Sequence, residues 1–283
     1  MRRRELLEGL ALGAGGLSVT GLAGTSTASP AREGDRGDWR GLRVGVATYS
    51  LRELSLEDAI AAIRRVDLAY ASIKSFHLPL ESDPEQRQGV AAQFQAAGIA
   101  PLSCGNITLK NDPADVRRAF EYARDAGIPT IVCAPDPGAL PLLDGMVKQF
   151  DLRIAIHNHG PEDEHFPSPY AVWDAVGSYD ERIGLCIDVG HTARAGVDPA
   201  ESIRRCRGRL YDLHLKDLDT TAPEGRSVEM GRGVLDVGAI LEALLEVGYP
   251  HLVSFEYEKD PEDPLPGLAE SVGYVKGVLR GIA

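Results

Sequence analysis

Two histidines stand at the end of an apolar, β-branched run near the middle of the sequence. His157 and His159 follow the run Ile154–Ile156, and Gly160 then ends the strand-like pattern. Because residues i and i+2 of a strand point to the same face, we expect both imidazoles to project together from the carboxyl end of that strand. A single histidine in such a place is usually a hydrogen-bonded structural residue, so the case for a site depends on other strands.

Three later apolar runs also end in side chains that can bind metals. They end in Asp188, His214 and Glu256, and Lys216 shares the strand face of His214. Two imidazoles and two carboxylates are a plausible donor set for one divalent cation. The carboxylates neutralise its charge, and the nitrogens favour Mn, Co, Zn, Ni or Fe over Mg. We therefore predict one metal site formed by His157, Asp188, His214 and Glu256.

The chemistry that fits this set is proton transfer next to a carbonyl group. A cation that chelates a carbonyl and the adjacent hydroxyl of a substrate acidifies the hydrogen between them, and a nearby base then moves that hydrogen. Glu256 and His159 are the candidate bases. Lys216 either stabilises the enolate oxygen or acts as the base, and a structural ion pair with one of the carboxylates is its alternative role.

Three further side chains are candidates for substrate contact. Lys74 and His77 end the second strand-like run, and for both a purely structural role is equally expected. Arg232, between two glycines, is a candidate for holding an anionic substituent. The charged loop 161–169 is long for its place and is expected to be either a lid or a solvated loop.

Eight strand-like runs alternate with eight helical patterns from Arg43 onward. Asp-Pro pairs or a serine precede several helices, as N-caps do. The expected strands are 43–48, 69–74, 99–106, 128–134, 152–158, 182–188, 209–216 and 251–257; the expected helices are 55–65, 84–98, 113–127, a looser one ending at 150, 169–176, 199–206, 236–247 and 265–279. This alternation predicts a (β/α)8 barrel, whose strand ends meet at one face. The alternative, an open doubly wound sheet, would show a Gly-rich phosphate turn after the first strand, and Ala47–Ser50 is not one.

The composition restricts the class of partner. The formal net charge of −12 and the pI near 5.1 argue against nucleic acid and against an anionic membrane surface, because either requires a basic face. An acidic protein is compatible with neutral substrates and with metal sites. The composition is also compatible with a homo-oligomer.

The first 42 residues do not follow the barrel pattern. Consecutive arginines, Arg2–Arg4, precede an apolar run rich in Gly and Ala over residues 9–23. This layout is typical of a twin-arginine export signal, which we assign to residues 1–28, with a linker over 29–42 and the barrel over 43–283. The run is too short for a stable membrane span, and a retained anchor is the alternative. We expect a periplasmic or secreted protein.

The four cysteines, Cys104, Cys133, Cys186 and Cys206, show no CxxC spacing, and three lie inside apolar strand-like runs. Buried free thiols are therefore expected. A Cys104–Cys133 disulfide across neighbouring strands is the alternative, because the expected compartment is oxidising.

Four motifs follow one another in the second half of the sequence: Leu185–His191, His214–Asp217, Gly231–Asp236 and the stretch from Gly248 to Glu256. In this combination and order they resemble the xylose-isomerase-like TIM-barrel superfamily, and the resemblance covers roughly residues 43–280. This superfamily holds sugar isomerases and epimerases, inosose dehydratases and type-IV apurinic endonucleases. The resemblance implies a carbohydrate substrate, metal ligation by Asp188, His214 and Glu256, and a substrate contact for His191, which is also a candidate catalytic residue.

One position departs from the superfamily pattern. Members usually read Glu-Asn-His-Gly where this chain reads His157–Gly160. Epimerases of the superfamily use two glutamates on opposite sides of the sugar. With His157 in place of one of them, a reaction that needs a single base becomes more favoured: isomerisation, dehydration or β-elimination.

The resemblance thus implies a divalent-metal-dependent isomerase or epimerase that acts on a free sugar, a keto-sugar or an oxidised glycoside. One alternative is a 3-keto-glycoside lyase or dehydratase, which fits export and the missing glutamate. Another is a sugar-binding barrel without catalysis. An apurinic endonuclease is disfavoured, since the chain is acidic and lacks the additional ligands of a trinuclear site.

Overall fold

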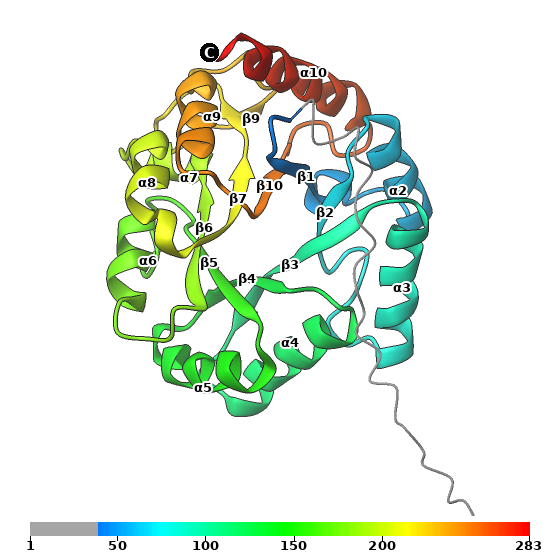
Figure 1. Cartoon of the computed structure of the whole chain (residues 1–283), viewed down its shortest axis with the longest axis vertical. Helices are drawn as coiled ribbons and strands as arrows, with labels where there is room; N and C mark the ends of the chain where they lie inside the picture. The colour runs from blue at the N-terminus through cyan, green and yellow to red at the C-terminus, as the bar shows by residue number, and fades with distance from the viewer. Residues whose placement is uncertain (1–38) are drawn as a thin grey trace, which may run out of the picture.

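The structure, a computed structural model, describes residues 39–283. Eight parallel strands close into a barrel, and helices surround it (Figure 1). Around the barrel the strands follow the order β1, β10, β7, β6, β5, β4, β3, β2. Their bounds are β1 Arg43–Ala47, β2 Tyr70–Ile73, β3 Ala100–Leu109, β4 Thr130–Pro135, β5 Arg153–His157, β6 Ile183–Asp188, β7 Leu210–Leu215 and β10 Leu252–Phe255. The predicted (β/α)8 barrel is confirmed.

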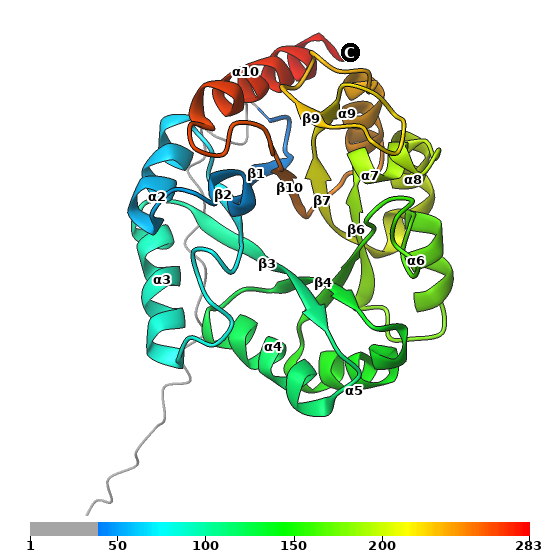
Figure 2. The same ribbon diagram turned by 180° about the vertical axis from the view of Figure 1, so that it is seen from behind.

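The helices form the outer ring, which Figure 2 shows from behind. They are α2 Leu56–Arg65, α3 Pro84–Ala96, α4 Pro113–Asp125, α5 Leu140–Phe150, α6 Pro169–Val176, α7 Val189–Arg194, α8 Pro199–Cys206, α9 Val237–Glu246 and α10 Leu265–Gly281. Most begin where the sequence predicts. Side chains of Ser or Asp accept a hydrogen bond from the first turn of α2, α3, α4, α6, α8 and α9, which satisfies N–H groups that have no partner inside the helix.

Two short features were not expected from the sequence. Helix α7 follows β6 directly, because Asp188 Oδ1 accepts the backbone N–H of His191 at 2.8 Å and so caps it. In the loop after β7, β8 (Asp217–Leu218) pairs antiparallel with β9 (Ser227–Val228). Both features lie at the carboxyl ends of the strands, where the loops of a barrel build its active site.

The folded part begins earlier than predicted. The expected signal, residues 1–28, and the first part of the expected linker lie outside the described residues. Trp39, however, is only 1% exposed, and its ring lies 6.4 Å from that of Phe255 on β10. The linker that we expected to reach residue 42 therefore stops before Trp39, because this indole belongs to the apolar core.

The cysteines are free thiols. Cys104, Cys133, Cys186 and Cys206 are all buried and none is bonded to another. In the pairing of β3 with β4, Cys104 lies opposite Ile131 and Cys133 opposite Ile107. The alternative of a Cys104–Cys133 disulfide is wrong for this structure, since the register does not place the two residues opposite each other. Over residues 39–283, none of the helices has the length and apolar character that crossing a bilayer requires.

His251, at the amino-terminal end of β10, provides a test of the packing at that end of the barrel. The rings of Tyr211 and Tyr249 lie 5.4 and 5.7 Å from its ring. Burial, with smaller effects from Arg153 and Arg43, lowers the pKa of His251 to about 4. Between pH 6.5 and 4 the unfolded chain therefore binds a proton that the folded chain does not, and stability falls as pH falls through this window.

Between neutral pH and pH 4 the free energy of unfolding should fall in both proteins. We expect the fall in His251→Gln to be smaller than that in the wild type by about 2 kcal/mol. This figure allows for the partial exposure of the ring. Urea unfolding at a series of pH values measures the difference, and the exposed His165 replaced by Gln serves as the control. Parallel losses in wild type and His251→Gln would contradict the desolvated state of the ring.

Candidate active site

Four predicted metal-binding residues meet at the carboxyl ends of neighbouring strands. His157 ends β5, Asp188 ends β6, His214 lies in β7, and Glu256 follows β10. One donor atom from each can be chosen such that all four lie within 4.8 Å of one another, and all four side chains are buried. Cross-strand pairing places Asp188 directly opposite His214. The tertiary structure thus brings together four residues that span 100 positions of sequence.

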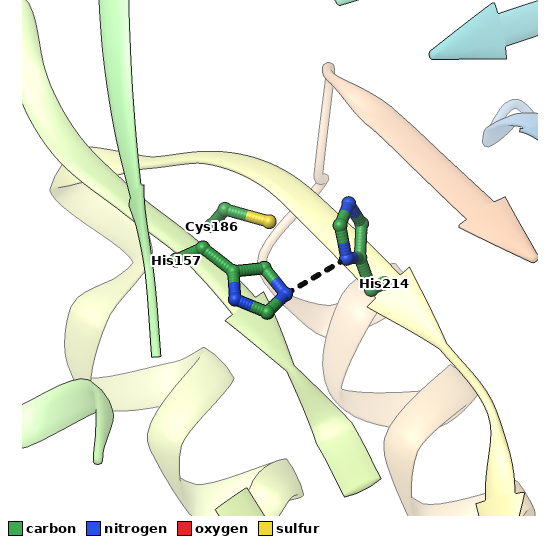
Figure 3. Close-up of side chains that lie close together, drawn as sticks. All are labelled: His157, Cys186 and His214. Atoms are coloured by element: carbon green, nitrogen blue, oxygen red, sulfur yellow. Dashed lines mark hydrogen bonds between the residues drawn. The ribbon is translucent and has the colours of Figure 1, made fainter. Parts of the chain in front are cut away.

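The contacts inside this cluster are short. Nε2 of His157 lies 3.0 Å from Nδ1 of His214 and 3.5 Å from Oδ2 of Asp188. Nδ1 of His214 also lies 3.0 Å from Oε2 of Glu256 and 3.7 Å from Oδ2 of Asp188. Figure 3 shows the two imidazoles turned toward each other, with the thiol of Cys186 beside them. Nitrogen and carboxylate donors therefore converge on one small volume.

The donor set fits a divalent cation. Two imidazole nitrogens 3.0 Å apart would direct lone pairs at each other unless a proton or a cation lies between them. Oδ2 of Asp188 is buried, and apart from its ion pair with Lys216 Nζ at 3.0 Å it accepts no hydrogen bond of good geometry from any described residue. A carboxylate oxygen has lone pairs for a further partner, such as a cation. Nitrogen and carboxylate donors together suit a first-row transition metal.

The pKa values of the two imidazoles are shifted in opposite directions. Burial lowers the pKa of His157 to about 3. Burial acts the same way on His214, but the carboxylates of Glu256 and Asp188 beside it hold its pKa well above the usual range. His214 is thus the more basic of the two rings, and a proton on its Nδ1 has two acceptors at 3.0 Å, Nε2 of His157 and Oε2 of Glu256. A cation at the cluster would take the place of that proton, as metals generally do when they bind imidazole.

A second donor set shares the two imidazoles. Cys186, two residues before Asp188 on β6, forms a possible triad with His157 and His214. Burial raises the pKa of the Cys186 thiol to about 11, so the sulfur stays protonated near neutral pH. Because only the thiolate is a good ligand, the set that contains both carboxylates is favoured.

Two lysines reach the cluster. Lys216 Nζ lies 3.0 Å from Oδ2 of Asp188 and 3.0 Å from Oε2 of Glu256, and it also contacts Glu258. Lys74 Nζ lies 3.3 Å from Oε1 of Glu256. Burial alone would lower the pKa of Lys216, but the three carboxylates hold it well above its usual range. These contacts favour the protonated form of Lys216, which suits it to stabilising an oxyanion better than to acting as a base.

Glu256 is also a poor base in this arrangement. Burial would raise its pKa, but His214, Lys216 and Lys74 hold it well below the usual range. Its Oε2 faces His214 and Lys216 while its Oε1 faces Lys74. Since both oxygens are engaged by positive or proton-donating groups, this carboxylate has little tendency to remove a proton from carbon.

A cavity of about 370 Å³ opens beside the cluster. Its lining includes Gly190, His191, Arg194, Lys216 and Glu258. His191, at the start of α7, has its ring centroid 5.8 Å from that of His157 and 5.2 Å from that of His159.

His159 stands on the solvent side of the histidine group. Its ring centroid lies 4.6 Å from that of His157, and 43% of its side chain is exposed. Strand β5 ends at His157, so His159 begins the loop, where its N–H donates to the carbonyl of Phe166 at 3.0 Å. The two imidazoles are close, as predicted, but only the first is buried. His159 remains accessible to a substrate.

Two predicted substrate contacts lie elsewhere. Nε2 of His77 lies 3.1 Å from the carbonyl oxygen of Leu54, and no described contact joins it to the cluster. Arg232 is 61% exposed and forms a two-pronged ion pair with Glu270 on α10, at 2.5 and 2.8 Å. The expectation that Arg232 holds an anionic substituent in the site is wrong, because its turn directs the side chain outward.

The buried carboxylate of Asp217 explains the course of that turn. Its two oxygens accept the backbone N–H groups of Gly231, Gly233 and Leu235 at 2.9 to 3.1 Å. A Cβ at Gly233 would lie 2.2 Å from Oδ1 of Asp217, so the close approach requires glycine there. The backbone of 231–235 therefore faces Asp217, and the side chain of Arg232 faces away.

Replacing Asp217 by Ala is expected to destabilise the fold by about 3 kcal/mol, because four backbone donors, the N–H of Leu218 and the three of the turn, lose their acceptor. Urea unfolding of the two proteins measures the loss. Asp219→Ala is the matched control: its exposed carboxylate accepts one loop N–H, that of Arg226, at 2.8 Å, and it should cost less than about 1 kcal/mol. Equal losses in the two variants would contradict this account of the turn.

Two residues near the cavity were missed by sequence reasoning. Glu258 stands two positions after Glu256, so the same-face rule that paired His157 with His159 also applies to it. Arg194 belongs to α7, a six-residue helix too short to show apolar periodicity. For Arg194 the sequence offered no signal beyond its place three residues after His191.

Comparison with known proteins places the fold in a family. The family model described as xylose isomerase-like TIM barrel matches residues 51–278. The rhizopine catabolism protein MocC of Rhizobium meliloti is 28% identical over 142 residues, which cover 44% of this chain and 43% of that protein. An inosose dehydratase of Lacticaseibacillus casei is 27% identical over 101 residues, 30% of this chain and 34% of that protein. The matched segments span less than half the length of these curated relatives.

Solved structures share the architecture. The 3-keto-D-glucoside 4-epimerase YcjR of E. coli superposes with a TM-score of 0.69 at 14% identity, over 83% of this chain and 99% of that chain. At this level of identity the likeness concerns the fold alone.

Proposed function

The chain belongs to the xylose isomerase-like TIM-barrel family, and we propose that it is a divalent-metal-dependent enzyme. We propose that it acts on a free sugar, a keto-sugar or an oxidised glycoside by removing a proton next to a carbonyl. One observation carries this proposal: His157, Asp188, His214 and Glu256 offer converging donors within 4.8 Å, beside an open cavity.

The metal and the lysines have complementary roles in this proposal. A divalent cation held by the four residues would supply Lewis acidity toward the substrate carbonyl, and Mn, Co, Zn, Ni or Fe suits the donors better than Mg. The ammonium groups of Lys216 and Lys74, both buried beside Glu256, stabilise negative charge that develops on a substrate oxygen. Fixed charges in a site that excludes water do this without reorganisation.

We assign the base to His159. Its imidazole is exposed and has no short hydrogen bond, the nearest carboxylate oxygen being that of Asp163 at 4.0 Å. The competing candidates are less suitable, because Lys216 is held protonated by three carboxylates and both oxygens of Glu256 are engaged. A general base such as an accessible histidine typically accelerates such a reaction by about 10²–10⁴-fold.

A reaction with one base is favoured over two-base epimerisation. The β5 position carries His157, a buried neutral imidazole, so no second carboxylate faces a substrate from that strand. Isomerisation needs one base to carry the proton, and dehydration or β-elimination needs one base and a leaving group. The second candidate function is therefore a 3-keto-glycoside lyase or a dehydratase. Names among the relatives, inosose dehydratase and 3-keto-D-glucoside 4-epimerase, cover this range of chemistry.

One experiment distinguishes these activities. The protein is loaded with Mn²⁺ and incubated in D₂O with a 3-keto-glucoside and, separately, with ketoses, and the products are followed by NMR. An unsaturated keto-sugar identifies the lyase, and deuterium in an otherwise intact aldose–ketose pair identifies the isomerase. If the metal-loaded protein binds sugars but never exchanges their α-protons, the enzyme proposal is wrong and a sugar-binding barrel is correct.

We also propose that the protein is exported by the twin-arginine route. The support is the sequence of residues 1–28, with Arg2–Arg4 before an apolar run. This route carries folded proteins, which suits an enzyme that acquires its metal before export. Replacement of the arginines by lysine should leave the protein in the cytoplasm, as cell fractionation would detect.

A further inference from the structure

The guanidinium of Arg194 joins three segments around the cavity. From α7, its Nε donates to the carbonyl oxygen of Pro223 at 2.6 Å, and its Nη2 donates to Oε1 of Glu162 at 2.6 Å. Its Nη1 lies 2.9 Å from Nδ1 of His191. The Arg194 side chain is only 12% exposed. Anchored in the loop after β5 and in the loop between β8 and β9, the guanidinium has a fixed orientation toward His191.

The contact with His191 determines which ring nitrogen carries the proton. A guanidinium has donors and no acceptor, so Nδ1 of His191 must present its lone pair to Arg194. The hydrogen of the neutral ring is then on Nε2. Among the described residues Nε2 has no hydrogen-bond partner, and the ring lines the cavity. His191 therefore offers an N–H group to whatever enters the cavity.

Gly160 supports this contact from a third side. Its φ is +92°, and a Cβ there would lie 3.2 Å from Nδ1 of His191 and 3.4 Å from Nη1 of Arg194. Positive φ values favour glycine, and here the absence of a side chain also leaves the space that the two groups fill. The Arg194–His191 pair is thus packed between backbone and loops, unlike a mobile surface pair.

We propose that Arg194 is a positioning residue that holds His191 in the Nε2–H form, so that His191 donates a hydrogen bond to a substrate oxygen. The inference rests on the proposed function and deepens it. It makes His191 a donor and leaves His159 as the base, which separates the roles of two imidazoles 5.2 Å apart. It also requires a substrate with an acceptor oxygen, carbonyl or hydroxyl, on the His191 side of the reacting carbon.

The tautomer can be read without a substrate. The full-length protein is labelled with ¹⁵N-histidine, and two-bond ¹H–¹⁵N correlation spectra are recorded near pH 7.5; His191→Gln identifies the His191 signals. We expect the Nε2–H pattern in the wild type and in Glu162→Gln, which loses the loop ion pair but keeps the donor to Nδ1. Arg194→Met should lose this pattern and show an average of both tautomers. An Nδ1–H or averaged pattern in the wild type, or an unchanged pattern in Arg194→Met, would overturn the proposal.

A kinetic measurement tests the consequence for substrate. In the α-proton exchange assay, Arg194→Met should lower kcat about 10-fold with a smaller change in KM. This fall in kcat is smaller than the roughly 10²–10³-fold fall that follows the removal of a whole oxyanion donor. Arg194→Lys, which keeps the charge, is the second variant if Arg194→Met does not fold. If Arg194→Met folds and loses the Nε2–H pattern of His191 but keeps the kcat of the wild type, the positioning role is wrong. If no sugar is turned over while the tautomer is as expected, the proposed function fails and the positioning stands.

Discussion

Asp188→Asn is expected to remove the metal from the protein and to lower its activity about 10³-fold. The carboxylate is fully buried, and its Oδ2 faces both His157 and His214 within 3.7 Å. An amide of the same shape lacks the negative charge that binds a cation. We expect affinity for Mn²⁺ to fall by more than about 100-fold, which exceeds the effect of losing an outer partner of a ligand. Elemental analysis of the purified protein and Mn²⁺ titration measure the change.

The substitution keeps the other role of Asp188, the cap of α7, because an asparagine oxygen also accepts the N–H of His191. Asp198→Asn is the matched control. Asp198 caps α8 in the same way, with Oδ1 accepting the N–H of Glu201 at 3.1 Å, and it is exposed. It should retain metal and activity. Full metal content in a folded Asp188→Asn protein would show that the cluster is not the metal site.

His157 is the second residue whose replacement should have a large effect. His157→Ala removes one of the two imidazoles that face each other at 3.0 Å and is expected to weaken metal binding by more than about 10-fold and activity by about 100-fold. His157→Glu restores the residue that the superfamily usually carries here. It should hold the metal, because a third carboxylate adds negative charge next to Asp188 and Glu256.

The two variants should differ in the reaction as well. With a carboxylate on β5, we expect the Glu variant to return protons to the opposite face of the substrate, so that an epimer appears in D₂O with deuterium at the exchanged carbon. His165→Ala, an exposed histidine in the next loop, controls for the general effect of losing an imidazole. If His157→Ala keeps wild-type metal content and activity, the four-ligand site is wrong.

Much of the barrel could be predicted because its signals are local. Caps such as Asp83, Asp112 and Ser168 act on the helix that follows them, and the periodicity of an apolar strand is contained within that strand. The four clustered residues were also predictable. Each lies within one residue of the carboxyl end of its own strand, and in a parallel barrel all carboxyl ends of strands meet at one face.

The roles of the charged side chains depended on the tertiary structure. For Lys216 the sequence left open a base, an oxyanion partner and an ion pair. Only the tertiary structure shows its ion pairs with Asp188, Glu256 and Glu258, which raise its pKa. Arg232 was misplaced because the buried Asp217, fifteen positions earlier in the chain, binds the backbone of its turn. A side chain of this length can reach many partners, and its spacing in the sequence does not identify which.

The two histidines at the end of β5 illustrate the same division. Their spacing determined that both rings lie together, and the structure confirms a ring separation of 4.6 Å. Which of them is buried among donors and which stays accessible was decided by the end of the strand at His157 and by loops from elsewhere in the chain. The role of Arg194 was decided by the tertiary structure alone, because its partners Glu162 and Pro223 lie 32 and 29 residues away in the sequence. The alternation of side chains along a strand and the capping of a helix depend on residues that are neighbours in the sequence. The protonation and orientation of a side chain depend on the charges that folding brings next to it.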